Sequence, residues 1–257
     1  MFLQWSKGFA AQCESTLTDY ELHKWLREEK FDVAYTEHID QCGYFLFKLA
    51  GIEKYATAIN LPALDGDSEL TGSPAFPSYI PTVLSRFTDR MTFFERMQNA
   101  MAIGVNWWIT GIVRGDMEIV RAKYAPQLPS STAILKNSTY FFYNAEPLIE
   151  FPRISVSKIV SIGGITVDRR KAKPLDEYWT KVFDLRKRTV LLSFGTVDDN
   201  TGEGIPNLVK SKWVPQFDMI MSGRVSLFMT HCGIASTMET LTAGTVIVLG
   251  KLNMIFF

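Results

Sequence analysis

Two short apolar runs in the C-terminal part of the chain restrict the fold more than any other feature. TVLLSFGT spans residues 189–196 and VSLFMTHCG spans residues 225–233, and each ends at small or polar side chains. Both have the length and the β-favouring composition of buried strands. A third run of this kind, TVIVLG at residues 245–250, follows a helical stretch. Strands that alternate with helices predict a parallel α/β sheet, whose ligands bind beyond the carboxyl ends of the strands.

The N-terminal half shows the same alternation of helix and strand. Apolar spacing predicts helices, and β-favouring runs predict strands. The expected helices lie at 12–30, at 42–51 with Gly51 as the C-cap, and at 88–124 with a break near Gly111 or Gly115. The expected strands are FDVAYTEHI, which we expect to be buried, YATAINLP, one or two within STAILKNSTYFFYNAEP, and KIVSIGGITV. Residues 62–82 are rich in Pro, Gly and Ser and predict a long loop.

A charged stretch with a proline, residues 168–188, separates the two halves. We interpret it as a linker with a lead-in helix. The expected organisation is an N-terminal domain at 1–167, the linker at 168–188 and a C-terminal domain at 189–257.

Charge and composition narrow the class of protein. The 27 basic and 27 acidic side chains cancel, which argues against nucleic acid as a partner. No signal peptide is recognised at the N-terminus, and no apolar run reaches the ~18 residues of a membrane span. The nearest, residues 100–113, is expected to be a buried helix segment with some affinity for a membrane surface. The triplet Asn137-Ser138-Thr139 would permit glycosylation in a secretory compartment.

The three cysteines, Cys13, Cys42 and Cys232, are too few and too scattered for a disulfide framework or a zinc site. A Cys13–Cys42 bridge is one alternative. Two unpaired cysteines are the expectation, because free cysteine is commonly buried.

The corner after VSLFMT combines groups that suit a nucleotide. A helix that begins near Ile234 would offer unpaired N–H groups and a positive dipole end to a phosphate. Gly233 would let a ligand approach the backbone closely. Upstream, KWVPQFDMI supplies a flat ring at Trp213 and a side-chain amide at Gln216. Ordinary helix capping uses the same residue types at the corner, so the corner alone leaves both interpretations open.

Together, "KWVPQFDMI…FMTHCGIASTMETLTAG" resembles the signature of the UDP-glycosyltransferase family, in particular the animal UDP-glucuronosyl and UDP-glucosyl transferases. LLSFGT, YNAEPLIEFPR with VSIGGI, and MTFFERMQN agree with the family in order. The resemblance implies a GT-B fold, two Rossmann-like domains that face a cleft, here incomplete at both ends. It also implies a UDP-sugar donor, a small lipophilic acceptor, no metal, no other cofactor and an endoplasmic reticulum membrane location.

The resemblance assigns the donor residues one by one. Trp213 and Gln216 would meet the uridine, Glu239 the ribose, and the remaining residues the diphosphate and its surroundings. This last group is Ser193, Gly195, Thr196, His231, Gly233, Ser236 and Thr237. Transfer would invert the anomeric centre, and Glu37 matches the carboxylate that orients the catalytic base.

The sequence departs from the family in four places. The base histidine that Glu37 would orient has no match, because His23 and His38 differ from it in context. Only 16 residues separate Thr196 from Trp213, too few for the expected crossover helices. The proline and the Asp-Gln pair that hold the sugar are not matched, and HGG is replaced by HCG. We therefore expect a transferase whose activity is compromised, or alternatively a non-catalytic fragment that binds a nucleotide, a membrane or a full-length relative. A nicotinamide oxidoreductase does not fit, because Gly163-Gly164 is not a GxGxxG turn.

Overall fold

The computed structural model of the protein describes residues 2–83, 85–194 and 207–249. Contacts divide the chain into two compact units, residues 1–162 and residues 163–256. Each unit is an α/β structure with its own parallel sheet and its own apolar core. Residues 1–162 form unit 1 and residues 163–256 form unit 2.

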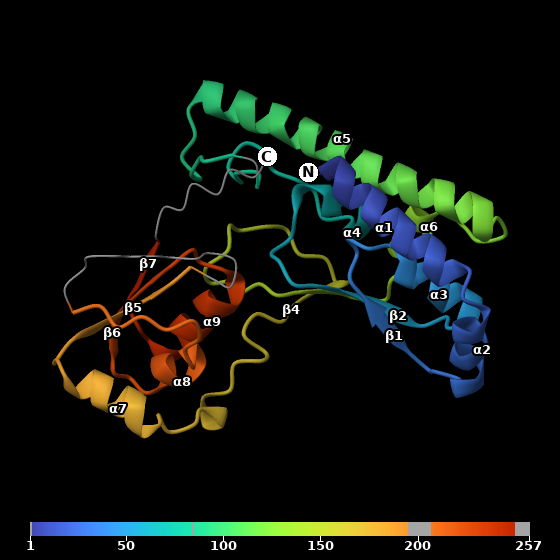
Figure 1. The fold of residues 1–257 in the computed structure, drawn as a ribbon. Helices are drawn as coiled ribbons and strands as arrows, with labels where there is room; N and C mark the ends of the chain where they lie inside the picture. The colour runs from blue at the N-terminus through green and yellow to red at the C-terminus, as the bar shows by residue number, and fades with distance from the viewer. Residues whose placement is uncertain (1, 84, 195–206, 250–257) are drawn as a thin grey trace. The chain divides into compact units, whose positions relative to one another are not determined.

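Unit 1 is built on four parallel strands in the order β1-β2-β3-β4 (Figure 1). The alternation in YATAI gives β2 its buried side chains at Tyr55, Thr57 and Ile59. All four strands lie within the runs that the sequence predicts. They are β1 (Ala34–Thr36), β2 (Tyr55–Ile59), β3 (Phe141–Tyr143) and β4 (Ile159–Ser161). The prediction of a buried first strand is wrong: β1 is an edge strand, and Tyr35 is 77% exposed.

The predicted helix at 12–30 is in fact two helices, α1 (Phe2–Leu17) and α2 (Tyr20–Glu29). The break has a local cause. Asp19 Oδ1 accepts a hydrogen bond from the Leu22 amide at 2.9 Å, so Asp19 caps a new helix instead of continuing the first. Helix α3 (Cys42–Ala50) ends as predicted at Gly51, which has φ 78°. Glycine adopts this left-handed conformation without the steric cost of a Cβ.

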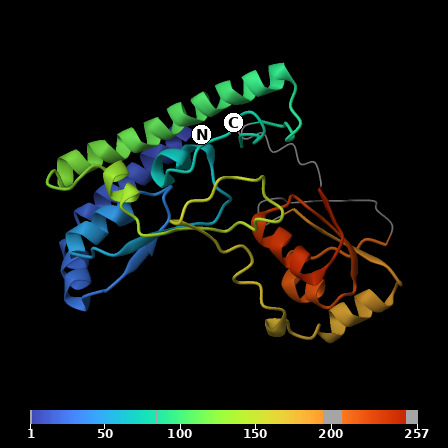
Figure 2. The same ribbon diagram turned by 180° about the vertical axis from the view of Figure 1, so that it is seen from behind.

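Helix α5 (Phe93–Tyr124) is continuous, so the predicted break near Gly111 or Gly115 is wrong. It begins with a capping box, in which Thr92 and Glu95 each satisfy the other's backbone amide. The helix lies alongside α1, as both views of the ribbon show (Figures 1 and 2). The expectation that residues 100–113 are buried is also wrong, since Trp108 is 69% exposed. Among the described residues, no helix combines the length and the apolar character that a membrane crossing requires.

Short helices replace two of the predicted irregular or extended segments. The expected loop at 62–82 contains a 3-10 turn, η1 (Asp65–Asp67), followed by α4 (Ser68–Thr71). The start of STAILKNSTYFFYNAEP is a helix, α6 (Ser131–Lys136), because Ser130 caps it by accepting from the Ala133 amide at 3.3 Å. Local capping thus overrides the β-like composition that favoured a strand there.

The core of unit 1 joins α1, α3, α5 and α6 to the sheet. Cys13 and Cys42 form a disulfide within it, with a Cα–Cα distance of 5.3 Å, so the expectation of two unpaired cysteines is wrong. The bridge ties α1 to the start of α3. Packing brings together two cysteines that are 29 residues apart, which spacing alone does not reveal.

Unit 2 has a three-stranded parallel sheet in the order β5-β6-β7. Its elements are η2 (Arg169–Lys171), α7 (Glu177–Asp184), β5 (Thr189–Ser193), α8 (Gln216–Met221), β6 (Val225–Thr230), α9 (Ile234–Ala243) and β7 (Ile247–Leu249). Helix α7, within the expected linker, packs Phe183 and Trp179 into the core of this unit. The three predicted strands are confirmed.

One face of the unit 2 sheet is left apolar and exposed. Leu191 and Phe228 are in register and share the face that packs on the helices. Residues one position along a strand point the other way. On that opposite face Val190 and Leu192 are 48% and 46% exposed. Parallel sheets are usually covered on both faces, so the exposed apolar face of the unit 2 sheet is unusual.

Candidate functional site

The carboxyl ends of β5 and β6 lie at one edge of the unit 2 sheet. Ser193, the last residue of β5, is the register partner of Thr230, the last residue of β6, and His231 follows directly. The predicted shared edge for Ser193 and His231 is therefore confirmed. The predicted ligands Gly195 and Thr196 lie outside the described residues.

Helix α9 begins where the sequence predicts, with Gly233 as its N-cap. Its first backbone amides are the unpaired donors that suit an anion. The structure gives a further reason for a glycine at position 233. A Cβ built on it would lie 2.9 Å from His231 Nε2 and 3.3 Å from His231 Cε1. Its own φ of −54° is open to any residue. In the structure it is therefore the His231 ring that needs Gly233 to lack a side chain.

Three of the predicted ligands are joined by hydrogen bonds. Gln216 Nε2 donates to Glu239 Oε2 at 2.8 Å and to Ser236 Oγ at 3.1 Å. Gln216 is the first residue of α8, whereas Ser236 and Glu239 lie one turn apart on α9. The amide uses both of its N–H donors in this way, so it holds the carboxylate and the hydroxyl in place. We call this set of three residues the Gln216 cluster.

The other residues predicted to bind the UDP-sugar differ in how accessible their side chains are to a ligand. Trp213 is 74% exposed, so its ring offers a free face to a flat ligand. The Thr237 hydroxyl donates to the Gly233 carbonyl at 3.1 Å, a bond within its own helix. His231 Nδ1 is buried and lacks a partner among the described residues. A buried ring nitrogen without a partner is uncommon and calls for an explanation.

Cys232 has a positive φ of 59°. A side chain in this left-handed conformation is strained, and the family's glycine at this place would not be. Burial raises the pKa of the Cys232 thiol, and the hydrogen bond with Thr237 partly offsets that effect. The thiol is therefore protonated at neutral pH. Among the described residues, no group of three or more His, Cys, Asp or Glu side chains could hold a metal ion.

In unit 1 a row of polar side chains crosses the carboxyl ends of β1, β2 and β3. Glu37 follows β1 directly and is exposed. Its Oε1 accepts from the Asn60 amide at 3.5 Å, and Asn144 Nδ2 donates to Asn60 Oδ1 at 2.8 Å. The row places Glu37 at the edge where ligands of parallel sheets bind. Nothing in the geometry gives Glu37 a histidine partner among the described residues.

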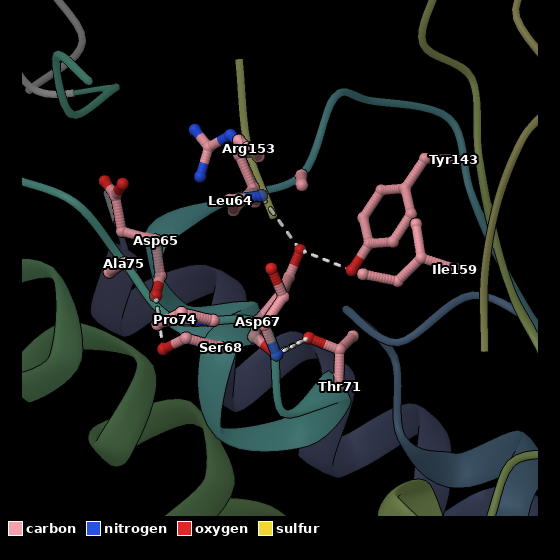
Figure 3. Close-up of a pocket in the computed structure, with 12 residues that line it drawn as sticks. Leu64, Asp65, Asp67, Ser68, Thr71, Pro74, Ala75, Tyr143, Arg153 and Ile159 are labelled. Atoms are coloured by element: carbon pink, nitrogen blue, oxygen red, sulfur yellow. Dashed lines mark hydrogen bonds between the residues drawn. The ribbon is translucent and has the colours of Figure 1, made fainter. Parts of the chain in front are cut away.

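A buried pair close to this edge escaped the sequence analysis. His38 Nε2 lies 3.1 Å from Asp67 Oδ1, and their side chains are 11% and 5% exposed. Asp67 Oδ2 also accepts from Tyr143 Oη at 3.1 Å and from the Leu64 amide at 2.9 Å, as Figure 3 shows. Burial, with the Asp67 carboxylate beside it, raises the pKa of Tyr143, which keeps its hydroxyl a donor. The Asp-Gly-Asp triplet at residues 65–67, between a strand and a helix, was the available signal.

Asp67 also lines a small pocket in unit 1 (Figure 3). Its other polar walls include Asp65, Ser68, Tyr143 and Arg153. Its volume is about 10 Å³, which is close to what one water molecule needs. The pocket is therefore too small for a nucleotide or a sugar, and we interpret the His38–Asp67 pair as part of the packing beneath the sheet edge.

Comparison with solved structures defines the fold. A glycosyltransferase of kitacinnamycin matches over 96% of this chain and 64% of its own, with a TM-score of 0.60 and 13% identity. Os79 from O. sativa, solved with UDP and deoxynivalenol-3-glucoside, matches over 97% of this chain and 65% of its own, with a TM-score of 0.54 and 14% identity. The fold is thus that of the GT-B glycosyltransferases.

Sequence comparison then gives the family. The family model described as UDP-glucoronosyl and UDP-glucosyl transferase matches residues 2–210. The chain belongs to this family, as its motifs predicted. It is 26% identical to 2-hydroxyacylsphingosine 1-beta-galactosyltransferase of Rattus norvegicus, over 93% of this chain and 49% of the relative. It is 25% identical to UDP-glucuronosyltransferase 2B7 of the same species, over 95% of this chain and 52% of the relative. The chain therefore spans about half the length of these curated relatives.

Proposed function

We propose that the protein is a UDP-sugar-dependent glycosyltransferase whose unit 2 holds the donor. The observation that carries this proposal is the Gln216 cluster, because it joins two separate motifs of the sequence at the edge where β6 ends and α9 begins. A cluster built only for helix packing would not require a carboxylate held by an amide next to a helix N-terminus. Membership of the family supports the same interpretation.

Each donor residue has a role that its position supports. Trp213 stacks on the uracil, since its ring is exposed. Glu239, held by Gln216, accepts hydrogen bonds from the ribose hydroxyls. His231 and the first amides of α9 surround the diphosphate, together with Ser193 and Ser236. These donors stabilise the charge that develops on UDP as it leaves, which is the main electrostatic contribution available to such a reaction.

The acceptor is a small lipophilic alcohol or phenol, and it binds at the carboxyl edge of the unit 1 sheet. Glu37 is the carboxylate at that edge, held by the Asn60 amide. By the resemblance it would orient the base that takes the proton from the acceptor hydroxyl, and no histidine among the described residues lies in that place. The hydroxyl oxygen then attacks the anomeric carbon, the bond to the UDP oxygen breaks, and the configuration at that carbon inverts.

Isothermal titration calorimetry with UDP tests the donor site. Loss of the stacking ring in Trp213→Ala should weaken binding roughly tenfold or more, because base stacking is worth on the order of 1–3 kcal/mol. Trp25→Ala is the matched control, since Trp25 is an exposed tryptophan of unit 1. Glu239→Ala should remove the preference for UDP over 2′-deoxy-UDP. Two outcomes would reject the proposal: no UDP binding by the wild-type chain, or wild-type UDP affinity in Trp213→Ala together with an unchanged ribose preference in Glu239→Ala.

A second candidate function is a non-catalytic fragment that pairs with a relative. The exposed apolar face of the unit 2 sheet favours it, because Val190, Leu192 and Val248 would be covered in such a complex. Mass spectrometry of a phenol incubated with UDP-glucuronic acid, UDP-glucose or UDP-galactose separates the two candidates. A conjugate that depends on the UDP-sugar supports the transferase. UDP binding without any conjugate supports the fragment.

We place the protein on the lumenal side of the endoplasmic reticulum membrane. The Cys13–Cys42 disulfide supports an oxidising compartment. Helix α5 supports membrane contact, because one of its faces carries exposed apolar side chains at helical spacing: Phe94, Met97, Met101, Val105 and Trp108. Co-sedimentation with phosphatidylcholine vesicles tests this contact. Changing Met101 and Trp108 together to serine should release the protein from the vesicles.

A further inference from the structure

We infer that Asn137 carries an N-linked glycan. Asn137-Ser138-Thr139 is the one Asn-x-Ser/Thr triplet of the 257-residue sequence, and its middle residue is not proline. On sequence alone such a triplet is a weak signal. Three structural observations make it a specific site. The inference rests on the lumenal location in the proposed function.

The first observation is the alternation of exposure across the triplet. Asn137 and Thr139 are exposed, whereas Ser138 is fully buried. The Ser138 hydroxyl lies 2.7 Å from that of Thr57, which in turn lies 2.7 Å from the Tyr44 hydroxyl. The core therefore fixes the middle residue, and the amide and hydroxyl on either side of it face solvent. The glycosylation machinery must reach both the Asn137 amide and the Thr139 hydroxyl.

The second observation is the place of Asn137 in the backbone. It is the C-cap of α6, with φ −86° and ψ 0°, and lies outside regular structure. Its side chain takes part in no hydrogen bond among the described residues. Thr139 lies two residues before β3, and its amide donates to the Tyr55 carbonyl at 2.9 Å. A substituent on the Asn137 side chain would thus break no packing and no hydrogen bond of unit 1.

The third observation is the position of the triplet relative to the sheet. It precedes β3, so it lies at the amino edge of unit 1, whereas Glu37 and Asn144 follow the carboxyl ends of β1 and β3. A glycan at Asn137 therefore leaves the candidate acceptor edge of unit 1 clear. The disulfide, which also supports the lumenal location, indicates that unit 1 folds where glycosylation takes place.

The modification is a transfer from a lipid-linked oligosaccharide diphosphate. Asn137 Nδ2 bonds to the anomeric carbon of the first sugar, and the bond from that carbon to the diphosphate oxygen breaks. The lipid diphosphate leaves with the bonding electrons. The amide nitrogen gives up one proton to the base of the transferring enzyme.

The test is expression of the full chain in insect cells, directed to the lumen by an added cleavable leader. Peptide:N-glycosidase F should increase the electrophoretic mobility of the wild-type protein and convert Asn137 to aspartate, which peptide mass spectrometry detects. Asn137→Gln and Thr139→Ala should abolish the shift. Thr139→Ser keeps the hydroxyl and should retain it, and Asn106→Gln is the control outside the triplet.

Thiol alkylation of the same samples shows whether the chain reached the lumen, because the Cys13–Cys42 bridge forms there. A wild-type chain with this disulfide but without a glycan would overturn the inference. UDP titration is a separate measurement: a glycosylated chain that fails to bind UDP rejects the proposed donor site and leaves the glycan assignment standing.

Discussion

The two units use the same type of sheet but support it to different degrees. The core cluster of unit 1 contains fifteen buried apolar residues and a disulfide, whereas that of unit 2 contains five, both counted among the described residues. The helices of unit 2 pack on the Phe228 face of its sheet, and the opposite face is exposed. Yet unit 2 carries the candidate donor residues. The comparison indicates that a ligand contributes relatively more to the stability of unit 2, since binding to the folded form adds to stability.

Truncating one core phenylalanine in each unit should have the largest effect. Phe228 and Phe141 are both fully buried, and Phe→Ala costs about 3–5 kcal/mol at such sites. We expect Phe228→Ala to unfold unit 2 and Phe141→Ala to leave unit 1 folded but weakened. Hydrogen–deuterium exchange, read peptide by peptide, measures both units in one experiment. If unit 2 withstands its truncation as well as unit 1 does, the small described core does not set its stability.

Removing the disulfide should have the next largest effect, and only on unit 1. The bridge closes a loop with a sequence separation of 29 residues, and loops of this length correspond to about 2–4 kcal/mol. Cys13→Ser combined with Cys42→Ser should therefore lower the denaturant midpoint of unit 1. UDP affinity and exchange in unit 2 should stay unchanged. An equal loss of stability in unit 2 would show that the units fold cooperatively, and it would contradict the view that they are stabilised separately.

The parts of the fold that the sequence predicts are those with a local signal. The strand runs, the Gly51 cap and the start of α9 depend on periodicity and on capping residues within a few positions. The errors have nonlocal or competing causes. Asp19 splits a helix that apolar spacing alone makes continuous. The glycines of α5 do not break it, because the helix packs along α1 and tertiary packing supplies most of the stability of a helix in a protein.

The same distinction applies to the candidate site. The motifs predicted which residues gather at the carboxyl edge of unit 2, because parallel strands bring their ends together. They did not predict that Gln216 donates to Glu239, nor that Gly233 makes room for His231. The buried His38–Asp67 pair was missed for the same reason. Such contacts join helices and loops whose packing depends on the whole fold.

Gly233→Ala tests whether the candidate site depends on the position of the His231 ring. The new methyl group would lie 2.9 Å from Nε2, so the ring must move. Loss of one hydrogen bond to the diphosphate, about 1 kcal/mol, should weaken UDP binding roughly fivefold. Gly115→Ala is the matched control in unit 1, because nothing lies within 4 Å of its added Cβ and it lies inside a helix. The control should stabilise α5 by about 0.5–1 kcal/mol and leave UDP binding unchanged. Unaltered UDP affinity in Gly233→Ala would show that His231 does not contact the ligand.

Cys232→Gly should have the smallest effect, and it is a gain in stability. Cys232 has φ 59°, and a left-handed conformation costs a residue with a side chain about 1–2 kcal/mol. Glycine removes this cost but gives the unfolded chain more freedom, which offsets about 0.4–1 kcal/mol. The net result should be a rise of about 0.5–1 kcal/mol in the free energy of unfolding of unit 2. Lys30→Gly makes the same backbone change at φ 53° in unit 1 and should stabilise only that unit. Cys232→Ala removes the thiol but keeps the strain, so it should bring no gain. If the alanine variant stabilises unit 2 as much as the glycine variant does, the partly buried thiol is the source of the cost, and the backbone conformation is not.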